Sequence, residues 1–506
     1  MHAVTGIRIL ALASLVAGAA FMVGAPPPAM AGEPRFLELT TPDFVIYSEL
    51  NEKRTRAIAF DVTRFQDVVA FFMSGVDVKP RVTTRIFALD SSNFVRYARP
   101  GPAVGGFFHE NPCANDIAID AGYELEAAFR IVFHEYMHYV LRNSAAVRYP
   151  PWYDEGLAEL LSTVEFTDEA VLVGRTPGGR RDVLEKSQWL PMRQLFAIPV
   201  NSPQFVKHKA VPSFYAESWV LMHYAALENP AALKQISDYL AALAAGKSTD
   251  QAFASAFGMQ YEELDSQLKR YARGGKFRYV GIPNGRIDQG RAFSPSIRQM
   301  SDEESELALG EFILRVDGDT EAARHLFATV LHTEGSNNRA VAGYAQALDG
   351  LTRGNEADAE LAKALPRSPN DPDLLDAKAR LIFERGVRAR NAGKKDGDFI
   401  ADAREIRRLL APAVNTEPLS CNRVFRYAQT FIGDTVDDSE ALDLLARALQ
   451  QMPRNASLWF TRATLNARDG KVKEAREAWA NASDYASDPW MKDYAKKRLA
   501  EMDKAP

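Results

Sequence analysis

Cysteine, net charge and long apolar runs are all scarce in this chain. Its 506 residues include only two cysteines, Cys113 and Cys421, which excludes a disulfide framework and leaves a hydrophobic core as the expected source of stability. A net charge of -5 gives no reason to expect a nucleic-acid partner. After residue 31, no stretch is apolar enough to cross a bilayer. What remains is ordinary globular composition in a chain long enough for two or three domains.

The first 31 residues have the pattern of a secretory signal peptide. Arg8 supplies the positive charge, residues 9–24 are almost wholly apolar, and the Ala-Met-Ala segment 29–31 offers a cleavage site. A membrane anchor is the alternative, but this run is short for a span of about 20 residues. We expect a cleaved signal and a mature protein that is exported, either to the periplasm or out of the cell.

Residues 35–123 predict a small mixed layer of strands and helix. Apolar residues alternate as in strands at 36–39, 44–47 and 81–88, and they have helical spacing at 54–72. A Gly- and Pro-rich loop is expected at 100–112, followed by a short strand at 115–120.

The strand at 115–120 is a candidate substrate-binding strand. An exposed strand edge can hold an extended polypeptide through backbone hydrogen bonds, whatever its side chains are. The residues expected to do so are Ile117, Ala118 and Ile119. An ordinary structural strand is the alternative.

The most informative motif is His134-Glu135-Tyr136-Met137-His138, within a predicted helix from about Glu124 to Arg142. Two histidines four residues apart share one helix face with a rise of about 6 Å, so both imidazoles can reach one metal ion. A lone histidine on such a helix is usually a satisfied core residue. Two at this spacing, in a chain with eight histidines, predict a zinc site.

Catalytic zinc needs three protein ligands and one open position. A second helix, predicted to begin near Trp152, carries Glu155 and Glu159 on one face. Glu155 is the candidate third ligand, and Glu159 is the candidate carboxylate that orients a ligand imidazole through its other ring nitrogen. The metzincin arrangement is excluded, because it requires Gly and His where Leu141 and Ser144 stand.

Together, His134–His138 and Trp152–Ala158 (Trp-Tyr-Asp-Glu-Gly-Leu-Ala) resemble the H-E-x-x-H and W-x-x-E-G-x-A motifs of gluzincin metallopeptidases of the peptidase MA-like kind. The resemblance implies one zinc ion per chain, held by His134, His138 and Glu155, with Glu135 as the general base. It also implies an α+β zincin-like catalytic domain with a mixed sheet and a helical subdomain. Zinc lowers the pKa of its bound water to about 7, and a nearby carboxylate takes the proton as the water attacks a peptide carbonyl.

Two more site residues follow from the same resemblance. Residues 105–111 (Gly-Gly-Phe-Phe-His-Glu-Asn) are comparable with the exopeptidase signature G-x-M-E-N, but they have an extra residue and no Met. Glu110 is therefore either a substrate-binding residue or a chance loop residue, and aminopeptidase activity is not predicted. A helical stretch at 213–227 offers Tyr215, with His223 as the second choice, to stabilise the oxyanion. An interfacial core tyrosine is the alternative.

The last two hundred residues show weak self-similarity. Segments that begin at Gly318, Gly354 and Gly470 each follow one predicted helix and precede another. The first two begin 36 positions apart, which is close to the length of about 34 residues of a tetratricopeptide repeat. Residues 301–506 thus resemble an all-α tetratricopeptide-like array, interrupted at 386–398. Such arrays usually bind another polypeptide, so a protein partner is expected.

The predicted order is a signal peptide (1–31), a gluzincin-like metallopeptidase domain (32–285), a linker (286–300) and helical repeats (301–506). Three functions remain open. The first is a zinc-dependent endopeptidase that acts on exported or envelope proteins. The second is a catalytically silent zinc-site protein whose repeats form a binding scaffold. The third is a scaffold without metal.

Overall fold

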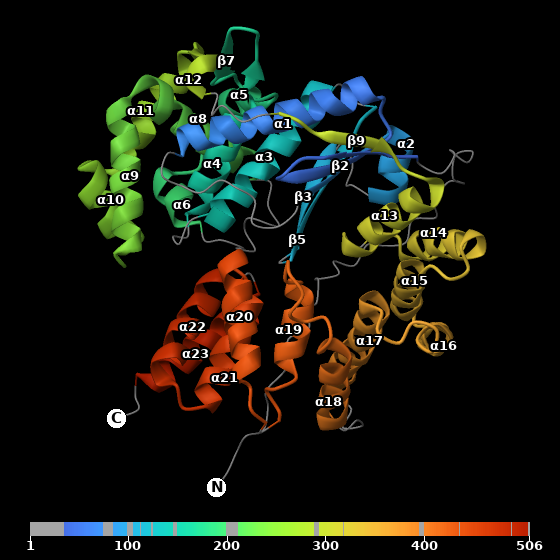
Figure 1. Cartoon of the computed structure of the whole chain (residues 1–506). Coiled ribbons are helices and arrows are strands. Elements are labelled where there is room, and N and C mark those ends of the chain that lie inside the picture. The colour runs from blue at the N-terminus through green and yellow to red at the C-terminus, as the bar shows by residue number, and fades with distance from the viewer. Residues whose placement is uncertain are drawn as a thin grey trace.

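The computed structural model describes residues 35–503, except for 74–83, 99–104, 112, 123–124, 145–148, 199–210, 288–292, 317, 394–398, 435 and 487. The expected signal peptide, 1–31, lies outside the described residues. A unit with a mixed sheet comes first, and a long array of helices follows it (Figure 1). Within the described residues, no helix is both long and apolar enough to span a bilayer.

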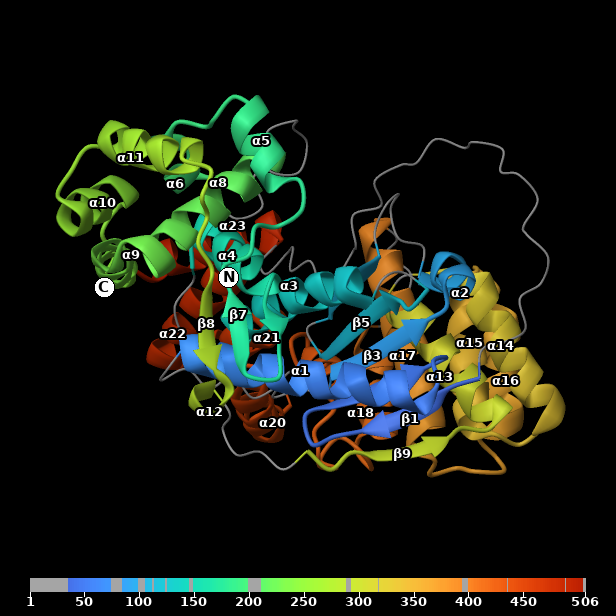
Figure 2. The same ribbon diagram turned by 90° about the horizontal axis from the view of Figure 1, so that it is seen from above.

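A six-stranded sheet organises the first unit, with strand order β4-β5-β3-β2-β1-β9. The parallel strands β2, β3 and β5 form its centre, and the other three pair antiparallel with their neighbours. Figure 2 shows the strands following one another from β9 to β5. Their bounds are β1 (Leu37–Thr40), β2 (Phe44–Ser48), β3 (Thr84–Leu89), β4 (Gly106–Asn111), β5 (Ala114–Asp120) and β9 (Ser296–Gln299).

The strand at 115–120 was expected to have an exposed edge, but β5 is paired on both sides. The loop predicted at 100–112 contains β4, which pairs with β5 on the side away from β3. The backbones of Ile117, Ala118 and Ile119 therefore have strand neighbours on both sides, and the edge strand of the described sheet is β4. Gly106 hid this strand in the sequence, yet it is required there, because a Cβ would lie 2.9 Å from the Ala118 carbonyl oxygen.

One face of the sheet is covered by α1 (Glu52–Phe72) and α3 (Leu125–Ser144). Alternation along the strands sends Ile46, Ile86 and Ile117 to this face, where all three are buried. The Phe65 ring of α1 stacks on the Phe133 ring of α3 with centroids 4.0 Å apart. This packing fixes α3, which carries the two motif histidines, against the sheet.

A helical subdomain and a small sheet complete the first unit. The sheet has the order β6-β7-β8, with bounds β6 (Glu165–Phe166), β7 (Ala170–Val173) and β8 (Val280–Pro283). The helices are α4 (Pro151–Ser162), α5 (Arg180–Lys186), α6 (Met192–Ala197), α8 (Val211–His223), α9 (Pro230–Ala244), α10 (Thr249–Phe257), α11 (Tyr261–Arg273) and α12 (Asn284–Ile287). Two π-helical turns (Phe94–Ala98 and Tyr224–Glu228) and the short α2 (Ser91–Asn93) also belong to this unit.

Helices α4 and α8 cross at Gly156. A Cβ on this glycine would lie 2.5 Å from the Ser218 carbonyl oxygen and 2.7 Å from Cγ of Met222. Only glycine lets the two backbones approach so closely. The glycine of the second motif therefore brings α8, which carries Tyr215, close to Glu155.

The array consists of eleven helices in the described part of the chain, running from yellow to red in Figure 1. They are α13 (Asp302–Arg315), α14 (Thr320–Thr333), α15 (Asn338–Gly350), α16 (Gly354–Ala364), α17 (Pro372–Asn391), α18 (Phe399–Leu410), α19 (Cys421–Gln429), α20 (Ser439–Gln451), α21 (Ala456–Arg468), α22 (Val472–Tyr485) and α23 (Pro489–Met502). The array turns back so that α20 and α21 lie below the helical subdomain.

The first helix pair of the array packs on the second face of the sheet. Phe87 of β3 stacks on Phe312 of α13 with ring centroids 4.3 Å apart, within a shared core. The stretch 286–300, expected to be a linker, supplies β9, which pairs with β1 and precedes α13 directly. Its Ser-Ile-Arg-Gln sequence has a single apolar residue, so the alternation that marks a strand is absent.

A buried ion pair crosses the same interface. Asp116 of β5 has a fully buried side chain and accepts hydrogen bonds from Nε and Nη2 of Arg315 at 2.9 Å. Removing one partner of such a pair leaves a buried charge without compensation.

We expect Arg315→Ala to lower the free energy of unfolding by about 3 kcal/mol, because it removes the guanidinium that hydrogen-bonds the buried Asp116 carboxylate and leaves only the charge of Arg85 near it. Urea denaturation measures the change. Arg353→Ala is the matched control, since Arg353 pairs with Glu356 in an exposed i,i+3 contact and its loss is expected to change little. Equal stability of the two variants would contradict the prediction.

The two cysteines form a disulfide across 308 residues, with Cα atoms 5.3 Å apart. Cys113 lies in the turn between β4 and β5, and Cys421 is the first residue of α19. Figure 1 shows α19 directly below β5. The bond tethers the first unit to the middle of the array, and each of these two parts has its own hydrophobic core.

Candidate metal centre

The candidate centre lies where α3 meets α4. His134 and His138 lie one helical turn apart on α3, and α4 begins at Pro151, a residue suited to the first helical position. The first turn of α4 then carries Asp154, and Glu155 follows it directly. His138 and Glu155 are 4% and 7% exposed, and His134 is half-buried.

His134, His138 and Glu155 present three donor atoms to one point. The two Nε2 atoms are 3.1 Å apart, and Oε2 of Glu155 is 3.3 Å from each of them. Zinc binds such atoms at about 2.0–2.1 Å, which makes neighbouring ligands of a tetrahedral ion about 3.3 Å apart. The spacing and the chemistry of these donors therefore fit one zinc ion.

Burial and charge support the same fit. Oε2 of Glu155 is buried without a hydrogen-bond partner among the described residues, a costly arrangement for a carboxylate oxygen. Burial raises the pKa of Glu155, but the His134 and His138 imidazoles outweigh it and hold the pKa well below its usual range. Burial lowers the pKa of His138, but Asp154 and Glu155 raise it to about 10. The cluster therefore attracts a positive charge.

Asp154 orients His138 and was not foreseen from the sequence. Its Oδ1 lies 2.8 Å from Nδ1 of His138. With Nδ1–H donating to this carboxylate, Nε2 is left free to bind a metal, a common arrangement around protein zinc. The only feature of the sequence that could have indicated Asp154 is its position directly before Glu155 in the second motif.

Glu159 lies beside the centre in a different arrangement from the expected one. Its Oε1 is 3.8 Å from Nδ1 of His134, beyond hydrogen-bond distance. Arg180 of α5 instead donates to both of its oxygens, at 2.6 and 3.0 Å. A buried carboxylate gains more from this bidentate guanidinium than from a single distant imidazole nitrogen. No spacing rule connects Arg180 to the motifs, so the sequence could not indicate it.

Tyr215 of α8 lies near the centre, where the charge of Glu135 also acts on it. The Tyr215 ring centroid is 6.4 Å from that of His134, and the Arg180 guanidinium lies 5.1 Å from the tyrosine ring. Burial, followed by the charges of Glu155, Glu135 and Glu159, raises the pKa of Tyr215, which keeps its phenol protonated. Tyr215 is thus a hydrogen-bond donor near the candidate zinc ligands.

The other predicted residues lie farther out. His223, the second choice for the oxyanion, is fully buried, with Nε2 2.9 Å from the Gly174 carbonyl oxygen and Nδ1 2.9 Å from the Tyr271 hydroxyl. It belongs to the core. Glu110 lies on β4 opposite Asn115, and its side chain is outside the described part of the structure.

Glu217 of α8 is another buried carboxylate, for which the sequence predicted no role. Glu217 is 1% exposed, and its Oε1 accepts a hydrogen bond from the Leu190 backbone at 2.8 Å. Its Oε2 has no hydrogen-bond partner among the described residues. Burial is the main cause that raises the pKa of Glu217 to about 8.

We expect Glu217 to make the protein less stable as pH rises. The folded state holds a proton on Glu217 up to about pH 8, whereas the unfolded chain releases it near the ordinary glutamate pKa of 4.5, so stability falls across this window. Glu217→Gln should reduce the fall in Tm between pH 5 and pH 8. Differential scanning calorimetry compares it with the exposed control Glu185→Gln, and identical pH profiles for all three proteins would contradict the assignment.

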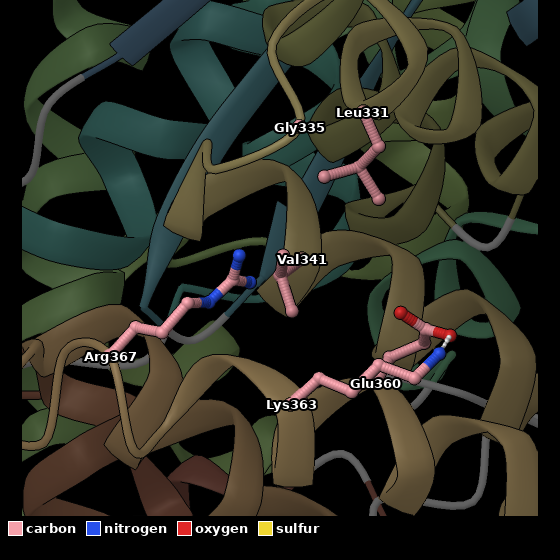
Figure 3. Close-up of a pocket in the computed structure, with 6 residues that line it drawn as sticks. All are labelled: Leu331, Gly335, Val341, Glu360, Lys363 and Arg367. Atoms are coloured by element: carbon pink, nitrogen blue, oxygen red, sulfur yellow. Dashed lines mark hydrogen bonds and ion pairs between the residues drawn. The ribbon is translucent and has the colours of Figure 1, made fainter.

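The array contains a pocket of about 360 Å³ where α14, α15 and α16 meet. Leu331 and Val341 supply its apolar lining, and Lys363 is paired with Glu360 at 2.7 Å. Figure 3 shows the Arg367 guanidinium directed toward Val341. The pocket therefore combines an apolar surface with positive charge.

Comparison with known proteins identifies the repeats. The tetratricopeptide repeat family model matches residues 315–381, so the chain contains a tetratricopeptide repeat region. No curated protein matches the chain.

Three solved structures resemble part of the chain. PilF of Pseudomonas aeruginosa is 17% identical with a TM-score of 0.33, and the match covers 40% of this chain and 84% of PilF. YrrB, described as a repeat protein with an unusual peptide-binding site, is 18% identical with a TM-score of 0.29 over 38% of this chain and 91% of YrrB. TTC0263 of Thermus thermophilus is also 18% identical with a TM-score of 0.29, and the match covers 40% of this chain and 98% of TTC0263. None of these matches identifies the first unit as a gluzincin domain.

Proposed function

We propose that the chain is a zinc-dependent peptidase whose repeats bind a protein. The observation that carries the proposal is the triangle of donor atoms from His134, His138 and Glu155, at 3.1 to 3.3 Å from one another. These residues would hold the ion. When bound, zinc supplies a water of lowered pKa and positive charge for a developing oxyanion.

The remaining steps belong to side chains of the protein. Glu135 follows the first ligand on α3 and would accept the proton of the attacking water, then pass it to the leaving amine. Tyr215 keeps its phenolic proton and would donate a hydrogen bond to the oxyanion. The outer edge of β4 would hold the substrate backbone as an added strand.

An exported location is part of this proposal. The signal pattern of residues 1–31 supports it, and so does the Cys113–Cys421 disulfide, because such bonds persist mainly in oxidising compartments. The substrate class that follows is exported or envelope protein.

A binding scaffold without catalysis is the second candidate, and the comparisons favour it over the peptidase. The family match covers repeats, which usually bind polypeptides, and the array has a pocket with apolar and cationic lining. In this alternative the zinc site is structural. Retention of Glu135 beside the donor triangle supports the peptidase, since a structural site has no need of that carboxylate.

Metal analysis and substrate screening separate the candidates. Protein purified without chelator should contain one zinc per chain and cut peptides in a broad library. One zinc per chain together with an uncut library would support a structural zinc site. Absence of metal would support a binding scaffold without metal.

We expect Asp154→Asn to weaken zinc affinity about 10- to 100-fold, because the amide orients His138 less strongly and leaves its Nε2 less basic. Competition with a chromogenic chelator measures the affinity. Asp182→Asn, on the exposed face of α5, is the control. Unchanged affinity in Asp154→Asn would argue against zinc bound through His138.

A further inference from the structure

Arg180 connects three helices beside the candidate centre. It is the first residue of α5, and its Nε and Nη2 donate to the two oxygens of Glu159 on α4 at 3.0 and 2.6 Å. Glu159 is 5% exposed, so its carboxylate is shielded from solvent. Two parallel hydrogen bonds fix the direction of a guanidinium as well as its distance from the carboxylate. The Arg180 guanidinium therefore has a defined position relative to α4.

The same guanidinium lies over the ring of Tyr215 on α8. Its Cζ atom is 5.1 Å from the ring centroid, within the distance at which an arginine is attracted to an aromatic face. The Tyr215 centroid is in turn 6.4 Å from that of His134 on α3, with the two ring planes tilted by 54°. Because Glu159 fixes the guanidinium, the guanidinium restricts where the Tyr215 ring can lie.

Arg180 also limits how closely Glu159 approaches His134. Oε1 of Glu159 is 3.8 Å from Nδ1 of His134, and Arg180 binds both carboxylate oxygens. Arg180 is not one of the three groups whose donor atoms converge on the candidate metal position. Its effect on the centre therefore passes through its two neighbours, Glu159 and Tyr215.

We propose that Arg180 is a positioning residue, which fixes the Tyr215 ring beside His134 and is itself held by its bidentate pair with Glu159. The consequence for catalysis rests on the proposed function, in which Tyr215 donates a hydrogen bond to the oxyanion; the position of the ring does not. An interaction that forms only in the transition state affects kcat and leaves KM nearly unchanged. A displaced Tyr215 should therefore lower kcat alone.

Fluorine NMR of full-length protein with fluorotyrosine placed at position 215 tests the position without any substrate. The parent should give one narrow resonance, separate from that of the denatured protein. Arg180→Met should broaden this resonance and move it toward the denatured position. Arg180→Lys should do the same, because an ammonium does not reproduce the planar fork that binds two oxygens and stacks on a ring. Arg181→Met, which removes the next arginine and its exposed pair with Glu185, is the matched control and should change nothing.

Kinetics of the zinc-loaded variants test the catalytic consequence. Arg180→Met should lower kcat for a quenched fluorescent peptide at least about tenfold and change KM less than about twofold, since a displacement of about 1 Å is costly at a reacting centre. This variant leaves the buried Glu159 carboxylate without its guanidinium. Arg180→Met combined with Glu159→Gln removes both charges, so it keeps both measurements decisive if the single variant folds poorly.

A fluorine resonance that stays unchanged in the Arg180 variants, or that changes equally in Arg181→Met, would overturn the inference. So would an active enzyme in which the Arg180 variants keep the parent kcat or lose only KM. Failure of the proposed function would look different: the resonance would depend on Arg180 as expected, while zinc-loaded wild-type protein would leave every peptide uncut.

Discussion

Glu135→Gln is expected to lower kcat/KM for a peptide substrate by about 10²- to 10⁴-fold while zinc content stays at one per chain. The amide has nearly the shape of the carboxylate but cannot accept the proton of the attacking water. Zinc is retained because the donor triangle consists of His134, His138 and Glu155, without Glu135. Hydrolysis of a quenched fluorescent peptide, together with metal analysis, measures both effects.

The control for this variant is Glu165→Gln, which removes a carboxylate from an exposed ion pair with Arg175. It should keep wild-type kinetics. Full activity in Glu135→Gln would exclude Glu135 as the base, whereas loss of zinc together with activity would show that this residue supports the site and not the proton transfer.

His138→Ala is expected to abolish both zinc binding and hydrolysis. The change removes one of three donors and leaves Asp154 without the imidazole that it contacts at 2.8 Å. Because zinc binds the folded state, zinc at 100 times its Kd should stabilise the wild type by about 2.7 kcal/mol and the variant hardly at all.

Thermal unfolding with and without added zinc makes this comparison. His332→Ala, which removes an exposed histidine of α14, should respond to zinc as the wild type does. A His138→Ala protein that keeps its zinc-dependent rise in Tm would contradict the ligand assignment.

The parts of the site that the sequence indicated are those set by local geometry. His134 and His138 converge because a helix repeats every 3.6 residues, and Glu155 follows on a second helix whose start is marked by proline. Asp154 and Arg180 contact the centre through the packing of separate helices. Their contacts depend on tertiary distances that no local pattern encodes.

The fold shows the same difference between features set by local sequence pattern and features set by tertiary packing. The mixed sheet and the helical repeats follow from periodicity, and the described structure contains both. Strand β4 was missed because it begins with glycine beside a proline-rich loop, and the linker was expected where β9 pairs with β1. The Cys113–Cys421 bond joins residues 308 positions apart, a separation at which pairing is decided by the packing of the whole chain.

The array is therefore more than an appended module. Its first helix pair covers one face of the sheet, its Arg315 binds Asp116 of β5, and its α19 is tethered at the end of β4. A partner held by the later repeats would lie at a fixed position relative to the candidate zinc ligands. This arrangement connects the two candidate functions, because a binding surface and a hydrolytic centre can serve the same polypeptide.

Mass-spectrometric identification of the products from a broad peptide library tests the central claim most directly. Zinc-loaded wild-type protein should generate new peptide termini that are missing with Glu135→Gln and with chelator-treated wild type, and they should return when zinc is restored. A library that stays intact with the zinc-loaded wild type, or termini produced equally by Glu135→Gln, would contradict a zinc peptidase.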